Sequence, residues 1–211
     1  MITFRKVKVC FILIFVFVNI VFISPCYSLS SREDLFRVAL DLSSVGKFNL
    51  ALQEWNRYLD FYPDDAAGFS NRGNVRLVIG DIKGSLDDQN KAISLNPSEI
   101  DPYINRGIAE EALGLWSQAK KDYMFVIAKD SKNFSALYNL ANVEGSLSHW
   151  EKARDLFSKA ASYNPGFAMA RSSMALVNNQ LGNIDESEKE LKNLIRRYPT
   201  FADARAALTA L

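Results

Sequence analysis

Apolar residues recur at spacings of three and four along most of the chain, which is the period of an amphipathic helix. In the segment "LFRVALDLSSVG" the apolar positions are Leu35, Val38, Ala39 and Leu42. Glycines and prolines punctuate the pattern, so that each helical segment is about 14 residues, or four turns, long. The pattern predicts an all-helical chain.

The helical segments return at a fixed interval of 34 residues. The phrase "FSNRGNVRLVIGD" at residues 69–81 reappears in altered form as "YINRGIAEEALGL" at residues 103–115. Four lines of residues share the interval: Pro63, Pro97, Ser131, Pro165 and Pro199; Gly46, Gly80, Gly114, Ser148 and Gly182; Ala39, Gly73, Gly107, Ala141 and Ala175; Ala51, Ser85, Ala119, Ala153 and Ser187. Such self-similarity indicates a repeat architecture.

Each line has a physical reason. A glycine just past the first helix of a unit can adopt the left-handed conformation that ends a helix. A proline just past the second helix cannot continue it, because proline has no N–H and pushes the preceding residue out of the helical region. Small residues are expected where two helices cross closely. One unit is therefore predicted to be a pair of antiparallel helices.

On these residues the chain resembles the tetratricopeptide repeat family. The lines of small residues and prolines match the family's pattern, as do the aromatic residues Phe48, Trp116 and Trp150 after the turn. The resemblance implies an all-α fold, a right-handed superhelical α-solenoid of about five helix pairs followed by a capping helix. The units would cover residues 32–65, 66–99, 100–133, 134–167 and 168–201, with the cap at 202–211.

A few residues depart from the family pattern. Arg72 and Arg106 replace a usual leucine, and their long stems are expected to cover apolar surface while the charge reaches water. Gln89 and Arg171 also stand where large apolar residues are usual. The first helix of the fifth unit is therefore expected to pack less firmly.

The resemblance implies that the first helix of each unit lines a concave face that binds other proteins. Asparagines recur on this face, one per unit in the middle of the array, and an amide can pair with both the N–H and the C=O of an extended peptide. Nearby apolar residues would add shallow contacts. The candidate peptide-binding residues are Asn71, Asn74, Asn105, Asn139, Asn142, Phe36, Ile104, Ile108 and Tyr138. The alternative is that these asparagines are ordinary helix-surface residues.

Other modes of action are disfavoured. A cationic clamp on a carboxylate needs several basic residues on the inner face, where only Arg37 is found. His149 reads as an exposed turn residue. The acidic pairs Asp64–Asp65, Asp87–Asp88 and Glu110–Glu111 read as solvated surface, because neighbours on a helix point in different directions. We expect no enzyme activity, cofactor or metal site, and expect Trp55, Trp116 and Trp150 to pack in the core.

The first 28 residues read as an export signal. Arg5, Lys6 and Lys8 precede an apolar run from Val9 to Ile23, and the small residues Cys26 and Ser28 favour cleavage after Ser28. The alternative is an uncleaved anchor, although the run is shorter than the roughly 20 residues that span a bilayer. In that case the chain would touch the membrane through this segment only. After cleavage the chain would contain no cysteine.

Beyond those three cations the chain holds 22 basic and 24 acidic residues. A nucleic acid partner would need a concentrated basic face, so we set it aside. The tail "RRYPTFADARAALTAL" is similar to that of tetratricopeptide proteins from cyanobacterial thylakoids and plastid lumens, which implies a periplasmic or lumenal location.

The sequence therefore predicts a non-catalytic, exported interaction module. Its concave face would hold an extended segment of another protein and aid the assembly or maintenance of a membrane complex, with photosynthetic complexes among the suggested clients. The alternative is a membrane-tethered scaffold that binds through its convex face or by self-association.

Overall fold

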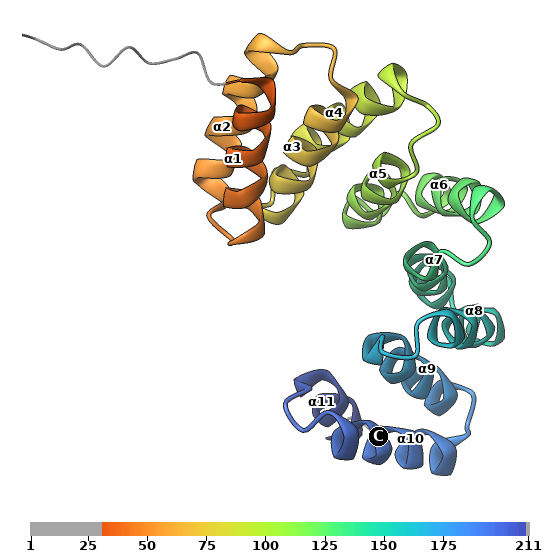
Figure 1. The fold of residues 1–211 in the computed structure, drawn as a ribbon. Coiled ribbons are helices and arrows are strands. Elements are labelled where there is room, and N and C mark those ends of the chain that lie inside the picture. The colour runs from red at the N-terminus through yellow and green to blue at the C-terminus, as the bar shows by residue number, and fades with distance from the viewer. Residues whose placement is uncertain (1–30, 210–211) are drawn as a thin grey trace, which may run out of the picture. The chain divides into compact units, whose positions relative to one another are not determined.

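The computed structural model describes residues 31–209, and within them it forms eleven helices and no strand (Figure 1). The helices are α1 (Arg32–Ser44), α2 (Phe48–Phe61), α3 (Ala66–Val78), α4 (Ile82–Leu95), α5 (Asp101–Ala112), α6 (Trp116–Lys129), α7 (Phe134–Ser146), α8 (Trp150–Tyr163), α9 (Ala168–Gln180), α10 (Ile184–Arg197) and α11 (Ala202–Thr209). The all-helical prediction is confirmed for these residues. The predicted export signal lies outside them.

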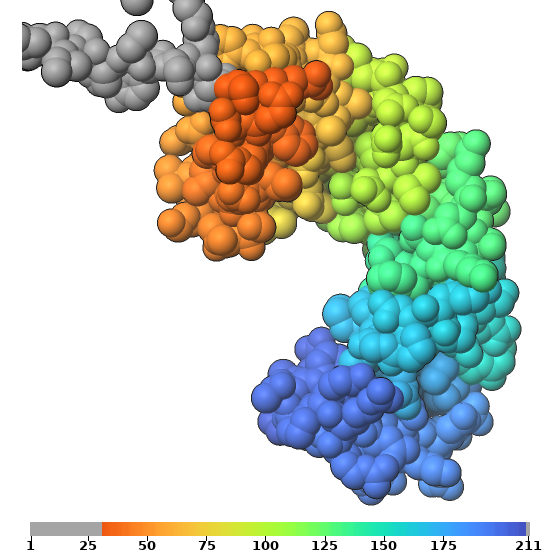
Figure 2. Space-filling view, in the orientation of Figure 1, coloured from red at the N-terminus to blue at the C-terminus, as the bar shows by residue number. Residues whose placement is uncertain are grey.

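Consecutive helices pack as neighbours along the chain. The odd-numbered helices also contact one another, α1 with α3, α3 with α5, and α5 with α7. Figure 1 shows the consequence: α3, α5 and α7 form the inner row of the array, and α4, α6 and α8 form the outer row. The space-filling view shows that this inner side is hollowed (Figure 2). The last helix, α11, packs against both α9 and α10.

The turn inside each helix pair is closed in the same way five times. The residue after each odd-numbered helix's cap has a left-handed backbone, with φ values of 76°, 86°, 72° and 83° at Gly46, Gly80, Gly114 and Gly182. Ser148 takes the fifth place with φ 60°. The next residue donates its N–H five residues back, as from Lys47 to the Leu42 carbonyl at 2.9 Å. The left-handed residue and this hydrogen bond together end the helix and satisfy a backbone carbonyl that would otherwise lack a partner.

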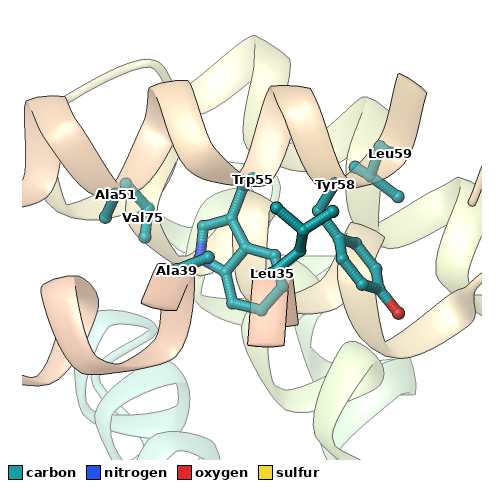
Figure 3. Close-up of a cluster of buried hydrophobic side chains, with 7 residues drawn as sticks. All are labelled: Leu35, Ala39, Ala51, Trp55, Tyr58, Leu59 and Val75. Atoms are coloured by element: carbon teal, nitrogen blue, oxygen red, sulfur yellow. The ribbon is translucent and has the colours of Figure 1, made fainter. Parts of the chain in front are cut away.

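Small residues lie where helices cross, as the sequence predicted. Ala51, Ser85, Ala119, Ala153 and Ser187 are completely buried. A Cβ atom placed on Gly107 would lie 2.6 Å from the Tyr123 ring, so a larger residue there would push α5 away from α6. Trp55 is fully buried in the first core cluster, with Leu35, Ala39, Ala51, Tyr58, Leu59 and Val75 (Figure 3). Its ring N–H donates to the Ser43 hydroxyl at 3.0 Å.

The prediction that Arg72 and Arg106 extend their charges into water is wrong. Arg72 donates through Nε and Nη2 to both carboxylate oxygens of Asp88, at 2.9 and 2.6 Å. Arg106 binds Asp122 in the same way, with both contacts at 2.7 Å. A third nitrogen of each arginine donates to an asparagine of the preceding unit, Asn56 or Asn90. We call these residues the arginine–aspartate network. It joins helices α2, α3 and α4 and, one unit later, α4, α5 and α6.

The expectation that the acidic pairs are solvated is also wrong for several of their members. Asp88 is 2 % exposed, and Asp122, its equivalent one unit later and not a member of these pairs, is 6 % exposed. Glu110 is buried on α5, where burial and the charge of Asp122 raise its pKa to about 7. Glu111 is half-buried, accepts a hydrogen bond from the Tyr123 hydroxyl, and has a pKa raised mainly by burial. Adjacent carboxylates on a helix do point in different directions, but here one of those directions is the protein interior.

The other departures from the family pattern are also accommodated by polar contacts. Gln89 is fully buried, and its amide donates to the Ser70 carbonyl across the α3/α4 interface at 3.0 Å. Arg171 on α9 donates to Glu190 on α10 at 2.5 Å. Both side chains bridge the two helices of their unit.

Candidate binding groove

A groove of about 540 Å³ opens on the inner row of helices. Its walls come from α3, α5, the α4/α5 loop and one residue of α7. The residues that line it are Asp65, Ala66, Ala67, Ser70, Asn71, Asn74, Asn96, Glu99, Asp101, Pro102, Ile104, Asn105 and Ser135. We refer to this set as the inner groove. It is open along one side, which suits an elongated ligand better than a small enclosed one.

Four of the nine residues predicted from the sequence line the inner groove: Asn71, Asn74, Ile104 and Asn105. The repeat places Asn71 on α3 and Asn105 at the equivalent position of α5. Because successive inner helices pack side by side, equivalent residues of neighbouring units face the same open space. The structure therefore brings these amides together in one groove.

The remaining predicted residues lie elsewhere. Asn139 and Asn142 are half-buried on α7, outside the inner groove. Three apolar candidates already pack against core residues. Phe36 meets Trp55 edge-on with ring centroids 5.0 Å apart, Tyr138 contacts Phe157, and Ile108 packs beside the core cluster that contains Tyr123.

The groove amides are partly engaged with the protein itself. The Asn71 side-chain nitrogen donates to the Ala67 carbonyl, one turn earlier on α3, at 2.9 Å. This bond uses one of its two donors and orients the side chain, while the amide oxygen stays an acceptor. Across the groove, Asn96 accepts from the Ser98 hydroxyl at 2.6 Å and donates toward Glu99 at 3.4 Å.

Charge in the inner groove comes from Asp65, Glu99 and Asp101. Asp65 is balanced, because Arg32 contacts it at 2.6 Å and Tyr58 donates its hydroxyl to it. Burial acts to raise the pKa of Asp65, but these two hydrogen bonds outweigh it and hold the pKa below its ordinary value. Asp65 also caps α3 by accepting from the backbone of Ala67 and Gly68. Its prediction as a solvated residue is wrong.

Several groove residues were not named from the sequence. Ala67, Asp101 and Ser135 each occupy the second position of their unit, so the repeat register itself could have identified them. Asn96 and Glu99 belong to the loop "NPSEI" between units. That loop reaches the groove because α4 and α5 pack side by side. The sequence analysis considered only the first helix of each unit and so did not predict this.

A second groove of about 430 Å³ lies between α7, α9 and α11. It is lined by Tyr138, Met169, Ser172, Ser173, Leu176, Phe201, Asp203, Ala206 and Ala207. Met169 and Leu176 are exposed. The two grooves differ in chemistry, since the first is lined by amides and carboxylates and the second mainly by apolar side chains.

His149 is exposed in the turn before α8, as the sequence predicted, but its imidazole is paired with a carboxylate. Its Nδ1 lies 2.7 Å from Glu144. Glu144 is completely buried and also accepts from Lys120 and Lys152, at 2.8 and 2.7 Å. Burial acts to raise the pKa of Glu144, but the hydrogen bonds from Lys120, Lys152 and His149 lower it to about 2. A carboxylate held this tightly by cations is a poor proton acceptor, so the cluster reads as structural.

Two further features bear on function. In residues 31–209, no group of three or more histidine, cysteine, aspartate and glutamate side chains is placed to hold a metal ion. Among the helices described here, none is long and apolar enough to cross a membrane.

Comparisons with known proteins agree with this geometry. Residues 138–200 match the tetratricopeptide repeat family model. No curated protein matches the sequence. Many solved structures share the fold, among them a thermophilic TPR protein of Thermus thermophilus, with a TM-score of 0.72 and 17% identity over 85% of this chain and 98% of that one.

Two other structures are similar in fold. A tetratricopeptide repeat protein from Parabacteroides merdae has a TM-score of 0.69 and 23% identity, covering 84% of this chain and 70% of that one. YrrB, described as a TPR protein with an unusual peptide-binding site, has a TM-score of 0.62 and 19% identity over 84% of this chain and 92% of its own. At these identities the likeness establishes the fold. The described helices therefore have the fold of a tetratricopeptide repeat array.

Proposed function

We propose that the protein is a non-catalytic interaction module that holds an extended segment of another protein in the inner groove. The observation that carries this proposal is the placement of Asn71 and Asn105, which project from successive helices into one open groove of about 540 Å³. An extended backbone presents alternating N–H and C=O groups, and amides can pair with both. YrrB, which has the same fold, is described as having a peptide-binding site.

The size of the groove fits a short segment. Inner helices of neighbouring units pack about 10 Å apart, so a groove that reaches from α3 to α7 spans about 20 Å. An extended chain advances about 3.4 Å per residue, and about six residues would therefore cover it. Asn71 on α3 would contact backbone groups at one end of the segment, and Asn105 on α5 would contact them near its middle.

We further propose that this module acts outside the cytoplasm. The support is the basic and apolar leader, followed by small residues at a suitable cleavage site. A periplasmic or lumenal position would allow the groove to hold clients during the assembly or maintenance of a membrane complex, photosynthetic complexes included.

Photo-crosslinking tests the proposal directly. A photoreactive amino acid at position 105 of the full chain should capture a client in the native organism. The same probe at Gln118, exposed on the outer helix α6, should not. Capture only from position 118 would instead favour binding through the convex face.

A variant with Asn71, Asn105 and Asn139 changed to alanine separates binding from folding. Asn71 and Asn105 line the groove. The half-buried Asn139 is the third of the asparagines that the sequence analysis places one per unit on the inner face. Exposed or half-exposed substitutions of this kind cost about 0.5 kcal/mol or less each, so thermal melting should change little. Crosslinking from a groove position left intact, such as Ser70, should be lost. Retained capture would show that the asparagines do not hold the client.

A further inference from the structure

The charged side chains that line the inner groove are all hydrogen-bond acceptors. Glu99 and Asp101 contribute carboxylates, which only accept, and the Asn71 amide has already used one donor on its own helix. Among residues 31–209, no lysine or arginine lines the groove. The charge of this lining is therefore negative, which favours a ligand that carries a positive charge.

Of the three carboxylates that line the inner groove, Glu99 and Asp101 are the two whose charge the described residues leave unbalanced. Neither forms an ion pair with a lysine or arginine of residues 31–209, whereas Asp65 is paired with Arg32. Asp101 stands in the first turn of α5, where the helix dipole favours a negative charge. Both side chains are exposed, so a cation can approach them without first displacing a protein partner.

The contrast with other acidic residues of the fold is informative. Asp88 and Asp122 bind arginines of their own unit, and Glu144 binds two lysines. These three buried carboxylates are paired with cations of the protein, and the exposed pair in the groove is not. Charge complementarity points to a positively charged occupant.

On the basis of the proposed function, we propose that the segment held in the inner groove is basic, with a lysine or arginine side chain that binds Glu99 and Asp101. The asparagines contact the backbone of the segment, and the two carboxylates select its charge. A lysine ammonium offers three donors and an arginine five, which the oxygens of the two carboxylates can accept. Because the site is open, salt weakens this part of the recognition.

Fluorescence anisotropy with three labelled peptides tests the inference. The peptides have about eight residues, long enough to cross the groove, and differ only in carrying lysine, glutamine or glutamate at alternate positions. We expect the full chain to bind the lysine peptide about tenfold more tightly than the glutamine peptide, and the glutamate peptide more weakly still.

Two matched double variants identify the residues responsible. Glu99→Gln with Asp101→Asn should reduce affinity for the lysine peptide about tenfold and should leave affinity for the glutamine peptide unchanged. Asp185→Asn with Glu186→Gln removes the same net charge from the exposed first turn of α10 and should change neither affinity. Equal loss in both variants would mean that only net charge matters and would overturn the inference.

The outcomes separate this inference from the proposed function. Equal binding of all three peptides, weakened by the triple asparagine variant, would overturn the charge preference and leave the peptide-binding function standing. Absence of binding by all three peptides at high concentration would count against both.

Discussion

The second and third units bury an aspartate at equivalent positions, but the two aspartates have different surroundings. Asp88 is bound by Arg72 and also by Arg76, whose Nη1 lies 3.0 Å away. Within residues 31–209, Arg106 is the one cation that binds Asp122, and Glu110 occupies the position equivalent to Arg76. One unit therefore places two cations beside a buried anion, and the next places one cation between two acids. The repeat sets the geometry, and single substitutions within it set the charge balance.

One unit further, the same position is filled by Glu144, which takes its cations from other helices. Lys120 reaches it from α6, and Lys152 and His149 reach it from α8 and its start. Glu110 and Glu144 are thus the same residue type at the same point of the fold, with pKa values moved in opposite directions. The comparison shows that partners from neighbouring helices decide how a buried carboxylate behaves.

The largest effect is expected for Arg106→Ala. Loss of the guanidinium leaves Asp122 buried without a cation and beside Glu110, and breaking a buried pair in this way costs about 3 to 5 kcal/mol. Arg72→Ala should cost clearly less, because Arg76 still contacts Asp88. Chemical denaturation of both variants gives the two free energies of unfolding. Equal losses of unfolding free energy would show that Arg76 does not compensate for the loss of Arg72.

A smaller loss is expected for Glu144→Gln at neutral pH. The change leaves Lys120 and Lys152 facing an uncharged amide, at a cost of about 1 to 3 kcal/mol. The folded pKa of about 2 lies below the ordinary 4.5, so the carboxylate stabilises the fold above about pH 4.5 and loses this effect as the pH falls toward 2. Denaturant titrations at about pH 7 and pH 3 should show the difference between variant and native protein shrinking in acid.

The opposite pH dependence is expected at Glu110. Its folded pKa of about 7 lies above the ordinary 4.5, so folding favours the protonated form, and stability is lost as the pH rises from about 4.5 through 7. Glu110→Gln should therefore raise the melting temperature by about 2 to 4 °C at pH 8, on the order of 1 kcal/mol after allowing for solvent screening. The gain should vanish near pH 4. A gain independent of pH would mean that packing, and not ionisation, is responsible.

The smallest effect concerns the turn of the fourth unit. Ser148 holds the left-handed conformation that glycine holds in the four equivalent turns, with φ 60°. Ser148→Gly should stabilise the protein by about 0.5 to 1 kcal/mol, since a side chain is strained in this conformation. The reverse change, Gly114→Ser, should destabilise by a similar amount, because the space around Gly114 is open and only the backbone is affected. Thermal melting of both variants tests these two effects: the melting temperature should rise for Ser148→Gly and fall for Gly114→Ser.

The sequence by itself determined the parts of this protein that repeat. Gly107 had to be small because Tyr123 lies against it, and Pro63 had to follow a helix because it cannot continue one. A residue type that the fold requires in every unit recurs at a constant interval along the sequence. Such a recurrence can be recognised without coordinates. The position of Asn71 and Asn105 on one inner face followed from the same interval.

Only the tertiary structure decided which long charged side chains meet, both within a unit and between units. Whether Asp88 is solvated or buried depends on Arg72 from a facing helix, and whether Glu144 is paired depends on Lys120 from the preceding unit. Glu99 enters the groove from a loop, because α4 and α5 are packed side by side. Long charged side chains can turn toward solvent or toward a partner, and that choice depends on the distance to groups far away in sequence. The repeat interval of the sequence does not give the distances between side chains that are far apart in the chain.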